Sequence, residues 1–309
     1  MTRRRPIAAV VGLLLGLFHL GGDLTIRAAD PEVQPAAHPA PTSAASVRFS
    51  QQPAHVGDRV AQQLSVKLDL STTITQSGQI ANRSTTSLER QQLRLIEVQE
   101  VVAGHVRRAK VVFRKHREKS PENEDPQQLV AQSVEGKSYL VAREGKQLIV
   151  TDLEGAIPPQ KEFEMVVNDM QMLGQPNPLA KFLVGRTLHV GDKLQLPKQI
   201  AEQLLGLGDP FGKVKKFEFQ LQDLQVIDEQ PCAVFAAIIA LAGDAQSPIK
   251  VNVQGQFAIQ TASCRTVVSR LTGPLNLATT ERTALGSYLY TVEGGLRVAI
   301  RSQYASPIQ

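Results

Sequence analysis

The chain has 309 residues and a formal net charge of +5, and 42% of its residues are hydrophobic but only 5% are aromatic. A core built from such a composition must use mainly Val, Leu, Ile and Ala, which favours strands. Residues 1–29 hold four of the 34 basic side chains and one of the 29 acidic ones, so the remaining net charge is only about +2 and nucleic-acid binding loses its main support.

The first 29 residues have the layout of an export signal. Arg3–Arg5 precede an apolar stretch from Ile7 to Leu20, and small residues follow at Ala28 and Ala29. The stretch is shorter than the roughly 20 residues that cross a bilayer. We therefore expect a signal peptide over 1–29, no transmembrane span in the mature chain, and export to the periplasm or the extracellular space. An uncleaved anchor or a short buried helix is the alternative.

Residues 30–46 are rich in proline and alanine and contain no bulky apolar run. Such a composition cannot bury enough surface to offset the entropy of ordering it. We expect a disordered tether there, with the folded part beginning near Val47.

Residues 47–158 form the expected N-terminal β half. In LSVKLDLS the residues Leu64, Val66, Leu68 and Leu70 alternate with polar ones, which puts the apolar side chains on one face of a strand. Alternation of this kind is typical of antiparallel sheets, because strands of parallel sheets are covered on both faces.

A basic stretch, HVRRAKVVFRKHREK, lies within this half. As a strand it places Arg108, Lys110 and Arg114 on one face and apolar residues on the other. This face would either bind an anionic partner or be a solvated surface that Glu118 and the acidic turn after it partly neutralise.

Residues 159–207 form the expected central helical segment. Phe163, Val167, Met170 and Leu173 recur at helical spacing after Pro158–Pro159 and before Gly174, which predicts an amphipathic helix. Its methionine-rich face would either cover a ligand cavity or simply pack on the sheet. A second short helix is predicted over 198–205.

Residues 208–309 form the expected C-terminal β half. KFEFQLQDL and IKVNVQGQFAIQ alternate strictly, whereas AVFAAIIALA is apolar on both faces and predicts a strand that is covered on both sides. Its cysteines, Cys232 and Cys264, would be either disulfide-bonded, as export permits, or two small buried residues.

The phrase HVGDRV at 55–60 returns as HVGDKL at 189–194. It is either a repeated local turn, with glycine at a positive φ and aspartate closing the turn, or the start of each of two duplicated β units. His55 and His189 would be turn residues or, if the two turns met, a shared ligand site.

The chain resembles an uncharacterised family of exported bacterial β-rich proteins. The resemblance lies in the order of its features: signal, tether, VGD turn, alternating strand, central helix, second VGD turn, and a strand with Gly255, Phe257 and Ile259. That family is similar in outline to the half-barrels of periplasmic lipoprotein carriers. The resemblance implies a curved sheet and helices around an apolar cavity, and no functional residues are carried over from it.

The sequence therefore predicts a mainly β protein with a large curved antiparallel sheet, half-barrel-like or formed by two packed β units, and one or two central helices. It contains no metal-ligand spacing, nucleophile elbow or phosphate-binding loop, so we expect no catalytic residues, metal or cofactor. We expect a cell-envelope or secreted protein that binds a lipid or another apolar ligand; the alternative is a structural or surface-assembly module that contacts other envelope proteins.

Overall fold

The computed structural model describes residues 45–121, 123, 125–205, 213–243, 249–283 and 286–306. The expected signal peptide and all but the last two residues of the expected tether lie outside these residues. Strands dominate the described part, which confirms the mainly β prediction.

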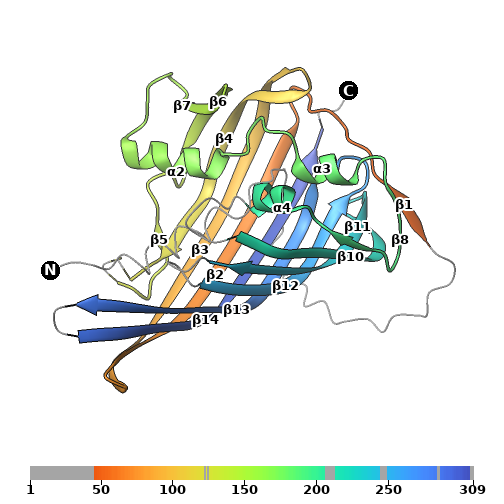
Figure 1. The fold of residues 1–309 in the computed structure, drawn as a ribbon. Helices are drawn as coiled ribbons and strands as arrows, with labels where there is room; N and C mark the ends of the chain where they lie inside the picture. The colour runs from red at the N-terminus through yellow and green to blue at the C-terminus, as the bar shows by residue number, and fades with distance from the viewer. Residues whose placement is uncertain are drawn as a thin grey trace.

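A single antiparallel sheet of twelve strands forms the body of the protein (Figure 1). The strand order is β7-β6-β4-β3-β2-β14-β13-β12-β11-β10-β9, with β5 pairing beside β4. The strands of the first half are β2 (Arg59–Gln76), β3 (Gln79–Val102), β4 (His105–Lys119), β5 (Val130–Ala131), β6 (Ser138–Glu144) and β7 (Gln147–Thr151). Those of the second half are β10 (Lys213–Ile227), β11 (Gln230–Ala242), β12 (Ile249–Gln260), β13 (Thr266–Thr283) and β14 (Gly286–Ala305). The edge strand β9 (Lys193–Gln195) comes from the expected central helical segment, which therefore also contributes to the sheet.

The two β halves join side by side into this one sheet. The first strand of the N-terminal half, β2, pairs along its whole length with β14, the last strand of the C-terminal half, so that Leu68 lies opposite Leu296. In the described residues the outer strands β7 and β9 pair with no further strand, so the sheet stays open. The expected curved, half-barrel-like sheet is therefore correct, and two separately packed β units are not what forms.

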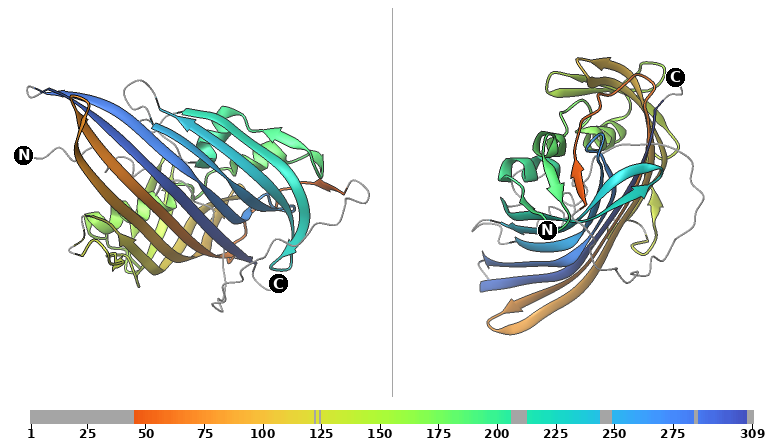
Figure 2. Two further views of the ribbon diagram at one scale, coloured as in Figure 1. Left: turned by 90° about the horizontal axis from the view of Figure 1, so that it is seen from below. Right: turned by 90° about the vertical axis from the view of Figure 1, so that its right-hand side faces the viewer.

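The helices lie on the concave face of the sheet (Figure 2), and the residues buried on that face are mostly apolar. Leu64, Val66, Leu68 and Leu70 of β2 are buried there, as the alternation predicts. From β10 and β12, the buried residues are Phe217, Phe219, Leu221, Val251, Val253, Phe257 and Ile259. The convex face carries the polar residues between them and faces solvent, which is the usual division of an antiparallel sheet with one covered face.

Glycines allow neighbouring strands to approach closely where the sheet curves. A Cβ on Gly255 of β12 would lie 1.8 Å from the Arg270 carbonyl oxygen, and one on Gly273 of β13 would lie 1.9 Å from the Asn252 carbonyl oxygen. Only glycine fits at these two points, and glycine inside a strand commonly marks such a bend.

The prediction that AVFAAIIALA is covered on both sides is wrong for most of its length. Cys232–Phe235 are buried on both faces of β11, but Ile238 on the convex face is 45% exposed. The small alanines that flank Ile238 on that face need no covering layer, because their apolar area is small.

The helices lie where the spacing predicts them, and one more is present. They are α2 (Gln160–Met170), α3 (Pro178–Leu183) and α4 (Lys198–Leu205), of which α3 was not predicted. A separate two-stranded sheet pairs β1 (Ser46–Arg48) with β8 (Thr187–His189) and lies on the concave side with α3 and α4. The main core is thus enclosed by the sheet, α3, α4 and this small sheet, while α2 covers the β4–β6 end.

Candidate functional site

Helix α2 is fixed to the concave face by both apolar and polar contacts. Val166 and Met170, four residues apart, are buried against β3, β4 and β6. In the first turn the Glu162 carboxylate accepts hydrogen bonds from Lys137 Nζ and from the Tyr139 hydroxyl, each at 2.6 Å. Burial by itself raises the pKa of Glu162, but these hydrogen bonds outweigh it and hold the pKa below its ordinary value.

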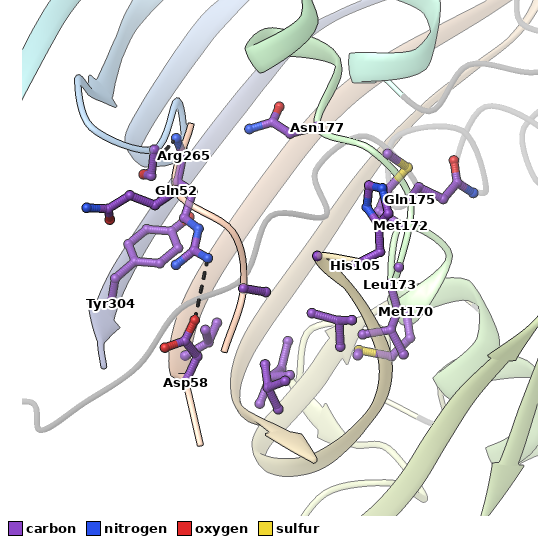
Figure 3. A pocket seen from close by; sticks show the side chains of 18 of the residues that line it. Gln52, Asp58, His105, Met170, Met172, Leu173, Gln175, Asn177, Arg265 and Tyr304 are labelled. Atoms are coloured by element: carbon purple, nitrogen blue, oxygen red, sulfur yellow. Dashed lines mark hydrogen bonds and ion pairs between the residues drawn. The ribbon is translucent and has the colours of Figure 1, made fainter. Parts of the chain in front are cut away.

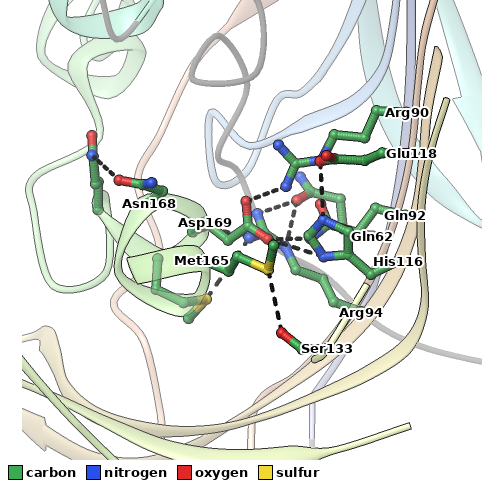
Figure 4. A network of polar contacts seen from close by, with 12 residues as sticks. Gln62, Arg90, Gln92, Arg94, His116, Glu118, Ser133, Met165, Asn168 and Asp169 are labelled. Carbon is green, nitrogen blue, oxygen red and sulfur yellow. Dashed lines mark hydrogen bonds and ion pairs between the residues drawn. The ribbon is translucent and has the colours of Figure 1, made fainter. Parts of the chain in front are cut away.

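Asp169, near the end of α2, is the centre of a buried polar network (Figure 4). Its carboxylate accepts a hydrogen bond from Arg90 Nη2 at 2.6 Å and another from the Gln92 side-chain amide. Its backbone carbonyl accepts a hydrogen bond from Arg94 Nη1. All four residues are buried, so α2 is held on the sheet through three side chains of β3.

Two further acceptors complete the network. Glu118 Oε1 lies 3.5 Å from Arg90 Nε and 3.4 Å from His116 Nε2, and Gln62 Oε1 accepts a hydrogen bond from Arg94 Nε at 3.0 Å. Burial lowers the pKa of Arg94 to about 10, although the charge of Asp169 opposes this shift. The pKa of Glu118 lies below its ordinary value, because the hydrogen bond with His116 and the charge of Arg90 outweigh the opposing effect of burial.

Sequence analysis missed this network because the apolar residues of this segment lie on the wrong face. Leu93 and Leu95 stand on the convex side, whereas Arg94 between them is buried on the concave side. The phase of burial does not change in this segment, although the pairing register with β4 shifts between Leu93 and Arg94. Every second residue counted from the buried Leu88 to the buried Ile96 shares one face of the strand, and this count places Arg94 on the buried, concave side.

A cavity of about 210 Å³ lies next to the network, between the end of α2 and the sheet (Figure 3). Much of its apolar lining comes from the start of β2, the last part of β3, and the C-terminal end of α2 with the loop that follows. The apolar residues from these elements are Val60, Ile96, Val98, Met170, Met172 and Leu173, and Ala54, Val106, Pro178 and the Tyr304 ring add to the lining. Arg94 and Asp169 also line the cavity, so the network forms part of its wall.

The loop after α2 is held in place at this wall. The Arg143 guanidinium donates hydrogen bonds to the backbone carbonyls of Leu173 and Gln171. Gly174 has a φ of +71°, and a Cβ there would lie 2.5 Å from the Val106 carbonyl oxygen. The cavity wall is therefore a defined structure that depends on glycine at this position.

The opposite end of the cavity is polar. Asp58 is only 3% exposed, and its Oδ2 accepts the His55 backbone N–H at 3.0 Å and lies 3.7 Å from Arg265 Nη2. Its Oδ1 has no hydrogen-bond partner among the described residues. The Arg265 guanidinium carbon lies 5.1 Å from the centre of the Tyr304 ring, and Figure 3 shows the three side chains together.

The two HVGD phrases form the same turn. Asp58 N–H donates to His55 O at 3.1 Å, and Asp192 N–H donates to His189 O at 3.0 Å. Asp192 Oδ2 accepts the His189 N–H at 2.8 Å, as Asp58 Oδ2 does from His55. The turn glycines, Gly57 and Gly191, have φ values of 86° and 100°.

Each turn also continues the ladder of the adjacent strand in the same way. Gly57 and Asp58 exchange two backbone hydrogen bonds with Val98 of β3, and Gly191 and Asp192 exchange two with Leu221 of β10. Both copies therefore form the predicted local turn, the first before β2 and the second before β9. A duplication of whole β units stays a hypothesis. The turns differ in surroundings, because only the first one lines the cavity.

The four predicted residues of the central helix divide into two pairs. Met170 and Leu173 line the cavity, whereas Phe163 and Val167 do not and are partly buried against the cluster on β4 and β6. The helix ends at Met170, and Leu173 belongs to the loop after it.

The basic residues of β4 lie on the convex face, away from the cavity. Arg114 is exposed, Lys110 lies opposite Glu97 in the register, and Arg108 Nη2 is 3.8 Å from Glu100 Oε2. The expectation that Glu118 neutralises this stretch is wrong, because Glu118 joins the buried network instead.

The cysteines are free and buried, so the disulfide alternative is wrong for this structure. Cys232 packs with Val234 and Ala258, whereas Cys264 belongs to the main core and its Sγ lies 3.3 Å from the Ser50 carbonyl oxygen. The two sulfurs thus pack in different clusters. Burial raises the pKa of each thiol to about 11.

Within the described residues no three His, Cys, Asp or Glu side chains are grouped so that they could hold a metal ion. In the same part of the chain, none of the helices has the length and apolar character needed to cross a membrane.

Comparison of the chain with models of known protein families and with curated proteins found no match to either.

Proposed function

We propose that the protein is an exported, non-catalytic binding protein of the cell envelope or the secreted fraction, and that it holds the apolar part of a small amphipathic ligand. The observation that carries this proposal is the cavity of about 210 Å³ between the end of α2 and the open sheet. The apolar, export-signal-like start of the chain supports export.

The lining of the cavity suits an irregular apolar group. Met170 and Met172 provide flexible, polarisable side chains, and Ile96 and Val98 add rigid aliphatic surface to the same lining. Ligand sites generally combine such an apolar lining with a few polar groups, which Asp58 and Arg265 supply here.

The size of the cavity limits the ligand. Pockets that enclose a drug-sized molecule usually measure roughly 300–1,000 Å³, which exceeds this cavity. The rest of the concave face is filled by the helices and by the main core. A single short chain fits this space, whereas the several acyl chains of a whole lipoprotein do not.

Solvent extraction of the protein tests this function. Protein purified from its own cell envelope without detergent is extracted with organic solvent, and the extract is analysed by mass spectrometry. We expect an amphipathic molecule in near-stoichiometric amount, and its loss in the variant Met172→Trp, which fills the cavity. Ile149→Trp, at an exposed position on β7, is the matched control. An empty wild-type protein that also fails to bind octyl β-glucoside in calorimetry would contradict the proposal.

A second candidate function is assembly with other envelope proteins. The β2–β3 and β13–β14 hairpins project past the helices (Figure 1), and they carry Ile80 and Leu289, which are 60% and 42% exposed. Exposed apolar residues on projecting strands are typical of contact surfaces. Concentration-dependent association in sedimentation equilibrium that is lost in Ile80→Lys would favour this function, and a monomer at all concentrations would count against self-assembly.

A further inference from the structure

We propose that Asp58 and Arg265 form the head-group end of the cavity and select a ligand whose head is neutral and carries hydroxyl groups, such as a sugar or a glycerol unit. This inference rests on the proposed function, since it assigns the polar end of the same cavity. The polar end would bind the head of the ligand, and the apolar wall would bind its tail.

The charges around the cavity balance one another. Two acidic side chains, Asp58 and Asp169, and two basic ones, Arg94 and Arg265, line it. A charged head of either sign would meet both attraction and repulsion from this balanced set, so no net attraction would offset the desolvation of its charge in a partly buried site. A head without net charge avoids this cost.

Two groups at this end have unused hydrogen-bonding capacity, one as an acceptor and the other as a donor. Asp58 Oδ1 is a buried acceptor without a donor, and Arg265 makes no side-chain hydrogen bond within the described part of the chain. Its one ion pair, with Asp58 Oδ2, is 3.7 Å long. A hydroxyl group both donates and accepts, so one hydroxyl can bond to the carboxylate while another accepts from the guanidinium.

The neighbouring side chains support the same chemistry. Arg265 lies over the Tyr304 ring, and Gln52 also lines the cavity and can donate and accept hydrogen bonds. Carboxylate, guanidinium and amide groups together can bond to the several hydroxyl groups of a polyol.

The second HVGD turn shows that Asp58 has a role beyond the turn. Asp192 makes the same backbone contacts, but its side chain is 45% exposed, so its other oxygen is free to bind water. Burial of an unpartnered carboxylate oxygen is therefore not required by the turn. It arises where the first copy meets the cavity.

Calorimetric titration with head-group analogues tests the inference. Octyl β-glucoside, octanoate and octyltrimethylammonium share one tail and differ in head charge, and each is titrated below its micelle concentration. We expect the glucoside to bind at least tenfold more tightly than either charged analogue. The variant Asp58→Asn, which keeps an acceptor for the His55 N–H, should weaken glucoside binding at least tenfold, and Asp192→Asn should leave it unchanged.

A second pair of variants keeps the test decisive if Asp58→Asn does not fold, which circular dichroism will show. Arg265→Gln should also weaken binding of the glucoside. Arg186→Gln is its control, because Arg186 lies over the Phe182 ring at 4.3 Å in a comparable contact outside the cavity. Tighter binding of a charged analogue, or unchanged binding in both Asp58→Asn and Arg265→Gln, would overturn the head-group assignment while leaving the cavity intact. Absence of binding by all three analogues would instead refute the proposed function.

Discussion

The Asp169 carboxylate lies 2.6 Å from Arg90 Nη2, although 79 residues separate the two in the chain and both are buried. This contact joins the C-terminal end of α2 to the middle of β3. Because Met170 and the loop after it form one wall of the cavity, the contact also sets the position of that wall.

Replacing Asp169 should be strongly destabilising. In Asp169→Leu the buried Arg90 guanidinium loses its carboxylate partner, and the buried Arg94, which bonds to the Asp169 backbone carbonyl, loses the nearby negative charge. Breaking a buried pair in this way typically costs about 3–5 kcal/mol. Urea unfolding followed by circular dichroism measures the change. Adding Arg94→Met should recover part of the loss, and the exposed Asn168→Ala on the same helix should change the unfolding free energy by less than about 0.5 kcal/mol. Equal stability of Asp169→Leu and wild type would show that the network does not hold α2.

The turn glycine of the second HVGD phrase should not tolerate a side chain. Gly191 has a φ of +100°, and a Cβ there would have no other atom within 4 Å. Gly191→Ala therefore adds backbone strain without a clash, at a cost of about 1–2 kcal/mol. Gly295 in β14 has equally open space but no positive φ. Gly295→Ala should therefore be neutral or slightly stabilising. Thermal unfolding of both variants and of the wild-type protein measures the difference. A similar loss in both variants would mean that the turn conformation is not the cause.

Both cysteines should react as buried free thiols. Because burial raises their pKa to about 11, the thiolate fraction is small at pH 8, and a thiol reagent should label neither Cys232 nor Cys264 in the native protein. In denaturant without reductant, both should react. Dithiothreitol should leave the melting temperature unchanged. A drop in melting temperature on reduction would instead reveal a disulfide.

Glu162 should contribute to acid sensitivity. Its pKa is lower in the folded than in the unfolded chain, so the stability it adds is present above the unfolded value of about 4.3 and is lost as the pH falls through its folded value. Unfolding free energies between pH 6 and pH 3 measure this slope. Glu162→Gln should lower stability by about 1–3 kcal/mol at pH 6 and flatten the slope below pH 4.5. The exposed Glu164→Gln serves as the control; an unchanged slope in Glu162→Gln would exclude this carboxylate as a cause.

The sequence predicts the sheet better than the site. Strict alternation, as at Leu64 to Leu70, identifies the covered face of a strand because the period of two is local and needs no partner. The joining of β2 to β14 depends on pairing between residues more than 200 positions apart, which no local pattern encodes. The cavity combines Asp58, Arg265 and Tyr304 from distant turns and strand ends, so their meeting follows only from the assembled sheet.

One local signal misled the interpretation, and one segment had no predicted inner face. In the latter, Leu93 and Leu95 lie on the convex side, and Arg94 between them is buried by its partners. In β11 the run of alanines suggests two covered faces, whereas alanine is small enough to remain partly exposed at little cost. In both cases the surroundings, and not the intrinsic preference of the residue, determine burial.

Photo-crosslinking is the most direct test of where the ligand binds. An octyl glucoside with a diazirine in its alkyl chain is bound to the wild-type protein, irradiated, and located by peptide mass spectrometry. We predict labels concentrated on Met170–Leu173 and on Ile96–Val98, which contribute to the apolar lining, and their disappearance in Met172→Trp. Labels spread over the convex face or on the projecting hairpins, unchanged in that variant, would contradict this prediction.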